Sequence, residues 1–121
     1  MFAAYAAFQG HLETLVKQLA DGRVNNQMGP QLMQLWQQEL APLQGESLSG
    51  DVYHQWRSLH TELHRDLRLL KMDLMFLGNS RSVATRSTKQ QAVGDRLKKL
   101  LQYCARIQQI IAADDPRTPA E

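Results

Sequence analysis

One apolar stripe runs through the middle of the chain without interruption for about seven helical turns. Its members follow one another at steps of three and four residues: Val52, Trp56, Leu59, Leu63, Leu67, Leu70, Leu74 and Leu77. This spacing keeps every member on one side of an α-helix, whereas a strand would need alternation at every second residue. The stripe therefore predicts one long helix, capped at Ser49 or Asp51, with an apolar face that needs a partner to cover it.

Shorter stripes of the same period predict three further helices. The first helix is expected over residues 3–21, the second over residues 30–41 with Pro30 at its first position and Pro42 as its limit, and the fourth over a C-terminal stretch that reaches Ile111. Their stripes are Tyr5, Phe8, Leu12, Leu15 and Leu19; then Leu32, Trp36, Leu40 and Leu43; then Val93, Leu97, Leu100, Cys104, Ile107 and Ile111.

The connection between the two longest predicted helices is short, which makes them antiparallel neighbours. The sequence thus predicts an all-α protein, an antiparallel four-helix bundle built on a long hairpin. The fourth helix begins near Ser82, or later if Ser87 and Gln90 form a capping box. Residues 1–113 are expected to form one domain, and residues 114–121 a disordered acidic tail.

Composition narrows the class of protein. The chain has 121 residues, one cysteine and a net charge of +2, but residues 52–113 hold eleven cations against four acids. A single Cys104 cannot form an internal disulfide and suits a reducing compartment. No leader peptide and no membrane helix is recognisable, so a cytoplasmic location is expected.

No set of residues resembles a catalytic, cofactor or metal site. The segment GNSRSVATRSTK lacks the preceding strand and the glycine spacing of a phosphate-binding loop. His60 and His64 lie one turn apart in HTELH, but Glu62 faces away from both, so two boundary histidines are the better interpretation. Cys104 continues the core stripe and is expected to be a buried, inert thiol. We expect no enzyme activity and no cofactor.

Two features suggest surface recognition instead. Leu69, Met72 and Phe76 form a second apolar strip, about 100 to 160° around the long helix from the Leu70 stripe. Either a neighbouring helix covers this strip, or it is an exposed docking patch for a partner or for a second copy of the chain. The strip is followed by a basic segment that contains Arg81, Arg86 and Lys89. These six residues are the candidate partner-binding site.

Asp73 lies about 60° from Leu70, at the border of the core. If the hairpin is centred near Ser80, the residue opposite Asp73 is close to Arg86. We therefore predict an ion pair between Asp73 and Arg86 or Arg81, which would fix the register of the hairpin.

The C-terminal half resembles the cyanobacterial heterocyst frequency control protein family (PatD). Three segments carry the similarity. They are a leucine-rich helix with Leu67, Leu69, Leu70, Asp73, Phe76 and Leu77; a turn with Ser80, Arg81, Ala84 and Thr85; and a helix with Asp95, Arg96, Leu97, Tyr103 and Cys104. Ser80 stands where the family has Ala, and Leu74 where it has Val.

The resemblance implies a small non-enzymatic regulator of cyanobacterial cell differentiation or cell division, which acts by protein–protein interaction on the division GTPase FtsZ. The alternative from another class is a basic helical bundle that binds nucleic acid through the turn between the two long helices. Residues 78–99 contain no aromatic side chain for base stacking, so that alternative depends on charge alone.

Overall fold

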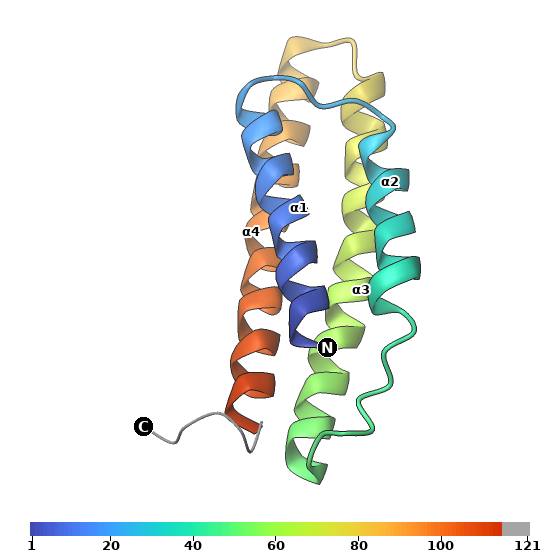
Figure 1. Cartoon of the computed structure of the whole chain (residues 1–121). Coiled ribbons are helices and arrows are strands. Elements are labelled where there is room, and N and C mark those ends of the chain that lie inside the picture. Colours follow the sequence, from blue (N-terminus) through green and yellow to red (C-terminus); the bar gives the residue numbers. More distant parts are fainter. Residues whose placement is uncertain (115–121) are drawn as a thin grey trace.

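The computed structural model describes residues 1–114, and every regular element in that part of the chain is helical. The helices are α1 (Phe2–Ala20), α2 (Met28–Leu35), α3 (Gly50–Asn79) and α4 (Val83–Asp114). One wider π-helical turn, η1 (Trp36–Leu40), continues α2. The predicted all-α fold class is therefore confirmed for the described residues, with four helices that pack against one another (Figure 1).

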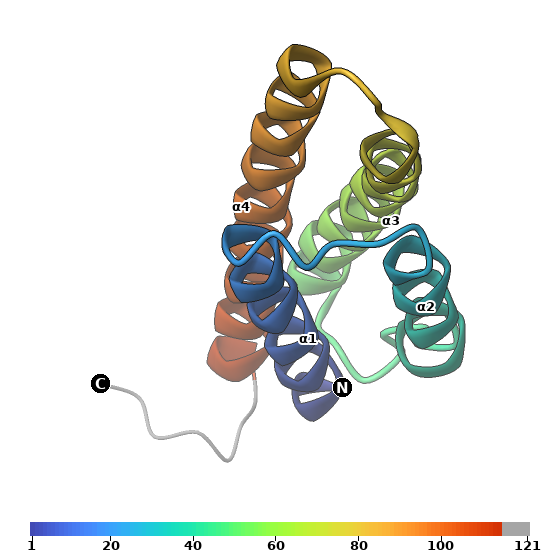
Figure 2. The same cartoon turned by 90° about the horizontal axis from the view of Figure 1, so that it is seen from above.

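The two long helices, α3 and α4, provide the framework on which the shorter helices pack. α1 packs against α4 and α2 packs against α3, so both short helices lie on the same side of the long pair (Figure 2). α3 and α4 extend past the short helices at the end where they are connected (Figure 1). As a result, every residue from Arg81 to Thr88 is exposed.

The core consists of the stripes that the sequence predicts. Leu63, Leu70 and Leu74 of α3 are fully buried, as are Leu97 and Leu100 of α4. The stripe of α1 joins them, because its five members are at most 8% exposed. Burial of this apolar surface is the main force that holds the four helices together.

α4 begins at the earlier of the two positions that the sequence allows. The Arg86 N–H donates to the Ser82 carbonyl oxygen at 2.9 Å, so α4 begins next to Ser82, and the capping box at Ser87 is wrong. The Gln90 side-chain amide instead donates to the Leu19 carbonyl oxygen at 3.3 Å and joins α4 to the end of α1.

α2 begins two residues earlier than predicted. The Asn25 side-chain oxygen accepts a hydrogen bond from the Gln27 N–H at 2.9 Å, which forms a turn that leads into the helix at Met28. Pro30 is therefore the third helical residue rather than the first, and its missing N–H still falls in the turn that has no intrahelical acceptor. The π turn was not predicted; in it the Ala41 N–H donates to the Trp36 carbonyl oxygen at 2.8 Å.

Gly29 allows α2 to approach α3 closely. A Cβ atom at Gly29 would lie 3.1 Å from the Lys71 Cα atom, which is closer than side chains normally pack. Glycine is thus required here by the contact between the helices rather than by backbone conformation. Lys71 also lines a groove between α2 and α3.

The end of α4 is joined to the start of α3. The Asp114 carboxylate accepts hydrogen bonds from the Ser49 N–H at 3.0 Å and the Ser49 hydroxyl at 2.7 Å. Ser49 is the residue before α3, as predicted, but its side chain does not cap that helix. The predicted tail of residues 114–121 thus begins within α4, and the rest of that prediction lies outside the described residues.

Candidate functional site

The predicted apolar strip is exposed. Leu69, Met72 and Phe76 are 37%, 49% and 46% accessible to solvent, and Met75 joins them at 45%. Within residues 1–114, Met33 of α2 and Lys89 of α4 border these side chains, but neither helix covers them. Of the two interpretations of this strip, the structure therefore favours an exposed patch. We call these four side chains the outer strip of α3.

A groove of about 540 Å³ runs along the outer strip, between α3 and α2. Met33 of α2 lines one wall, and Leu69, Met72 and Met75 of α3 form the floor. The remaining lining residues are all cations: Arg65, Arg68 and Lys71. The groove therefore combines an apolar, methionine-rich floor with a positively charged rim, a combination that the sequence strip alone did not reveal.

Only one of the three predicted basic residues contacts the strip. The Lys89 Nζ atom lies 5.2 Å from the centroid of the Phe76 ring, within the range of a cation–π interaction. Arg81 and Arg86 are exposed, and neither forms an ion pair within residues 1–114. The structure thus brings Leu69, Met72, Phe76 and Lys89 together, and leaves Arg81 and Arg86 on the projecting start of α4.

The predicted ion pair of Asp73 with Arg86 or Arg81 is wrong. Asp73 accepts a hydrogen bond from Arg96 Nε at 2.9 Å. The two long helices separate toward their connecting loop (Figure 2), and Arg86 lies on the fully exposed first turns of α4. Asp73 consequently pairs with a cation further along α4, where the helices are in contact.

Arg96 also reaches Asp66, a buried carboxylate that the sequence analysis did not single out. Asp66 is 0% exposed; its Oδ1 accepts a hydrogen bond from Arg96 Nη1 at 3.1 Å. The Lys99 Nζ atom lies 3.5 Å from Asp66 Oδ2, which forms an ion pair but no hydrogen bond. Helical periodicity could have predicted this burial, because Asp66 lies only about 40° from the Leu70 stripe. A carboxylate in that position needs a partner of opposite charge.

His60 and His64 belong to an aromatic cluster between α1, η1 and α3. The His60 ring lies between Trp36 and Trp56, with centroid distances of 4.7 and 4.8 Å. His64 stacks on Trp36 with parallel rings 4.8 Å apart. Both histidines are partly buried, as the boundary interpretation predicted, but their contacts with Trp36 and Trp56 were not foreseen.

A chain of hydrogen bonds fixes the tautomer of His60. Trp56 Nε1 can only donate, and it donates to the Tyr5 hydroxyl oxygen at 2.8 Å. The Tyr5 hydroxyl and His60 Nδ1 form a hydrogen bond at 2.6 Å. Because the Tyr5 oxygen already accepts from Trp56, we assign the Tyr5 hydroxyl as the donor, which places the His60 proton on Nε2. Burial, and secondarily the nearby His64, lower the pKa of His60 to about 4, and burial raises the pKa of Tyr5. The cluster is therefore neutral at physiological pH.

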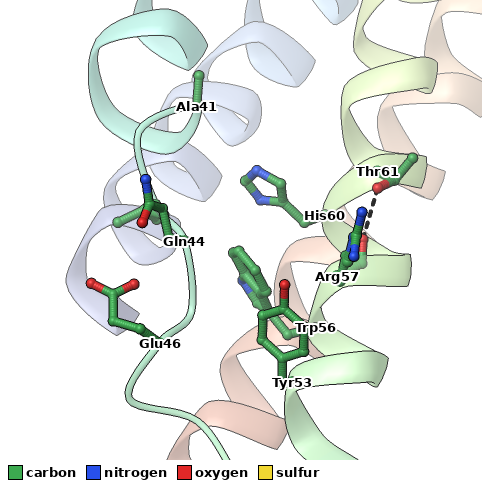
Figure 3. A pocket seen from close by; sticks show the side chains of 9 residues that line it. Ala41, Gln44, Glu46, Tyr53, Trp56, Arg57, His60 and Thr61 are labelled. Carbon is green, nitrogen blue, oxygen red and sulfur yellow. Dashed lines mark hydrogen bonds between the residues drawn. The ribbon is translucent and has the colours of Figure 1, made fainter.

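A shallow pocket of about 580 Å³ opens next to this cluster, between α3 and the loop that precedes it (Figure 3). Tyr53, Trp56 and His60 line it from α3, while Glu46 on the loop and Arg57 on α3 place charges of both signs at its edges. Gly45 in this loop has a φ of 70°, and a Cβ there would meet the Trp56 ring at 2.8 Å. The loop is thus closed over Trp56, and the pocket is the outer boundary of a packed cluster.

Cys104 is fully buried, as predicted, and burial raises the pKa of its thiol to about 12. A thiol in that state is not a nucleophile at neutral pH. Within residues 1–114 no three His, Cys, Asp or Glu side chains come together in a group that could hold a metal ion. Among the same residues, no helix has the length and apolar character needed to cross a bilayer.

Comparisons with family models, with curated proteins and with solved structures each find no match to this chain.

Proposed function

We propose that this protein is a non-enzymatic regulator that acts in the cytoplasm by binding another protein through the outer strip of α3. The observation that carries the proposal is the contrast within one helix: α3 buries six members of its core stripe, from Trp56 to Leu77, and leaves four large apolar side chains exposed on another face. Exposed apolar side chains that form a contiguous patch with a charged rim are typical of a protein-binding surface.

We also propose the finer description of the fold, an antiparallel four-helix bundle with a long α3–α4 hairpin. In this arrangement the hairpin supplies the rigid frame and α2 forms one wall of the groove. A rigid frame suits binding, because little conformational entropy is lost when the partner docks.

The resemblance to the heterocyst frequency control family suggests the process and the partner. On that basis we propose a role in cyanobacterial cell differentiation or division, with FtsZ as the partner protein. The residues that carry the resemblance include Leu69 and Phe76 of the outer strip and Arg81 after it. These three side chains are exposed and can therefore contact a partner.

The test is a binding titration of FtsZ with the wild-type protein and the variant Phe76→Ala. Phe2→Ala is the matched control, since Phe2 is 44% exposed and Phe76 46% exposed, on different helices. We expect FtsZ to bind the wild type and the Phe2 variant with equal affinity. The Phe76 variant should bind about tenfold or more weakly, as expected when an anchor residue of an interface is removed. Absence of FtsZ binding to the wild type would reject this partner.

Nucleic-acid binding is the second candidate, and one observation favours it: Arg81 and Arg86 project with the first turns of α4 and have no ion pair within residues 1–114. The surrounding cations are less available, however. Lys89 covers Phe76, and Arg96 and Lys99 contact Asp66. Few cations beside the loop that connects α3 and α4 are therefore left to neutralise phosphates.

A salt series separates the two functions. Binding to generic DNA or RNA should weaken steeply with salt and depend on Arg81, Arg86 and Lys89, because release of counterions drives it. Binding to a protein through the outer strip should depend on Phe76 and vary less with salt. Tight nucleic-acid binding that the triple variant R81Q/R86Q/K89Q abolishes, with no FtsZ association, would establish the second candidate instead.

A further inference from the structure

We propose that the groove between α2 and α3 binds an acidic amphipathic helix of the partner protein. This inference rests on the proposed function, and it adds the chemical class of the segment that docks. It also places the contact in the groove beside α2, and not at the connecting loop where the sequence-predicted residues Arg81 and Arg86 project.

The positive charge of the groove's rim favours a negatively charged partner segment. Arg65, Arg68 and Lys71 line the groove, and α2 contributes no charged residue to the opposite wall. Of the acids in α3, only Glu62 touches this rim, with its carboxylate 3.6 Å from Arg65 Nε. The rim therefore carries an excess of positive charge that no other part of residues 1–114 neutralises, and glutamates or aspartates on a partner would complement it.

Asp66 and Asp73 cannot neutralise the groove, although both lie on the same helix. Their carboxylates are held by Arg96 on the other side of α3, where α4 packs. α3 thus directs Asp66 and Asp73 toward α4, and places Arg68 and Lys71, which have no ion pair within residues 1–114, around the groove. This separation makes the groove face of α3 basic although the helix as a whole contains several acids.

The floor of the groove fits the apolar ridge of a helix. Leu69, Met72 and Met75 follow the spacing i, i+3, i+6, and the stretch of α3 from Arg65 to Met75 is about 15 Å long, or about three turns. The groove lies between two helices, so a third helix can lay its own ridge of side chains into it. Met33, Met72 and Met75 have flexible thioether side chains that can repack around such a ridge.

A second copy of this chain is a poorer fit. α1 has exposed apolar side chains in Phe2 and Val16, but it carries only one acid, Glu13, which Lys17 balances. An anionic membrane would match the charge but not the shape, because a bilayer surface cannot fill a groove between two helices. A helical protein segment with flanking carboxylates matches both properties.

The experiment titrates the whole chain with three synthetic peptides of about three helical turns. The first peptide has leucines at steps of three and four residues with glutamates on both flanks. The second has lysines in place of the glutamates, and the third is a scrambled form of the first. The signals are the ¹³C-methyl resonances of the five methionines, of which Met33, Met72 and Met75 line the groove while Met1 and Met28 do not and serve as internal controls.

The acidic peptide should shift the methyl signals of Met33, Met72 and Met75 and leave those of Met1 and Met28 in place. The charge-reversed variant R68E/K71E should bind it about tenfold or more weakly and gain affinity for the lysine peptide. The matched control K17E/R106E changes two exposed cations away from the groove and should bind the acidic peptide like the wild type.

Equal binding of the acidic and lysine peptides, or equal binding of the scrambled peptide, would overturn the proposal. So would the same three methyl shifts at equal strength with phosphatidylglycerol vesicles, or on raising the concentration of the protein alone, which would indicate a membrane or a second copy. FtsZ is titrated in parallel. FtsZ binding without acidic-peptide binding would reject this inference and keep the proposed function, whereas peptide binding at the groove without FtsZ binding would keep the inference and reject that partner.

Discussion

The inner and outer faces of α3 contain similar apolar side chains in opposite surroundings. Leu70, on the inner face, is 0% exposed, whereas its neighbour Leu69, on the outer face, is 37% exposed. The inner face also contains a charged residue, Asp66, that is completely buried, while the outer face contains Met72 and Phe76, both nearly half exposed. Apolar content alone therefore does not identify the core of this helix.

The two faces differ in whether their residues find partners within the chain. The inner face finds its partners within the chain: its apolar residues pack in the core, and the buried Asp66 forms ion pairs with Arg96 and Lys99. The outer face has Lys89 over Phe76 and Met33 beside the groove, but its apolar surface is left open. On the proposed function, the inner face stabilises the fold and the outer face binds a partner, and the following predictions test this division.

The largest effect is expected for a pair of neighbouring leucines. Leu70→Ala should lower the free energy of unfolding by about 3–5 kcal/mol, because it leaves a cavity among fully buried side chains. Leu69→Ala should change it by less than about 1 kcal/mol, because Leu69 contacts solvent. Both values come from urea unfolding followed by circular dichroism. Similar losses for the two variants would remove the distinction between the faces.

The two aspartates that pair with Arg96 should also differ in their contribution to stability, with the larger contribution from the more buried one. Asp66→Asn should cost about 2–3 kcal/mol of stability, since it leaves Arg96 and Lys99 facing a buried neutral amide. Asp73→Asn should cost about 1 kcal/mol, because its carboxylate is 19% exposed and water replaces part of the interaction. If Asp73→Asn costs more than Asp66→Asn, Asp73 rather than Asp66 is the main partner of Arg96.

The histidine cluster at the edge of the inner face should make stability depend on pH. The pKa of His60 is about 4 in the folded protein, below the ordinary value, so the unfolded chain binds its proton first as pH falls. The stabilisation is complete above about pH 6.5 and is lost between about pH 6.5 and pH 4. Because the ring is partly exposed, we expect a loss of about 1–2 kcal/mol, with a contribution of the same sign from His64, whose pKa burial also lowers.

Unfolding measured across this pH range in His60→Phe tests the assignment. Phenylalanine has no proton to bind, so the loss of stability below about pH 6.5 should be smaller than in the wild type. His11→Phe, which removes an exposed imidazole on α1, is the control. An unchanged profile in His60→Phe would mean that other groups titrate in this range.

The smallest effect on folding is expected at the outer strip. Phe76→Ala should lower stability by about 0.5–1 kcal/mol, which includes the loss of the contact with Lys89. The control Phe2→Ala, with similar exposure, should give a similarly small value. A melting curve for each variant suffices. A loss of several kcal/mol in Phe76→Ala would assign the outer strip to the fold rather than to binding.

The sequence predicts most of this fold because each core stripe follows a helical period. The stripes of α1 and α4 are buried as expected, the stripe of α3 is buried except at Val52 and Leu59, which are partly buried, and Cys104 is buried because it continues the stripe of α4. The early start of α2 was missed because it depends on a side-chain hydrogen bond of Asn25, and periodicity does not report such bonds. The π turn after α2 was missed for a similar reason: a stripe does not show the hydrogen-bond pattern behind it.

The candidate site could be predicted only in part. Periodicity placed Leu69, Met72 and Phe76 on a second face, but it could not decide whether a neighbouring helix covers that face. The partner of Asp73 was wrong because counting residues from the loop assumes that the helices stay in contact to their ends, and they separate instead. The groove was missed because Met33 belongs to α2, and no local pattern connects it with Leu69 and Met72.

The proposal that the outer face of α3 serves binding and not folding is best tested by the affinity of FtsZ for the triple variant L69Q/M72Q/F76Q. We expect a wild-type melting curve to within a few degrees and FtsZ binding weakened by about a hundredfold or more, because the apolar anchors of the interface are lost together. The control F2Q/V16Q, which changes exposed apolar residues of α1, should bind like the wild type. Wild-type affinity in the triple variant would contradict the account.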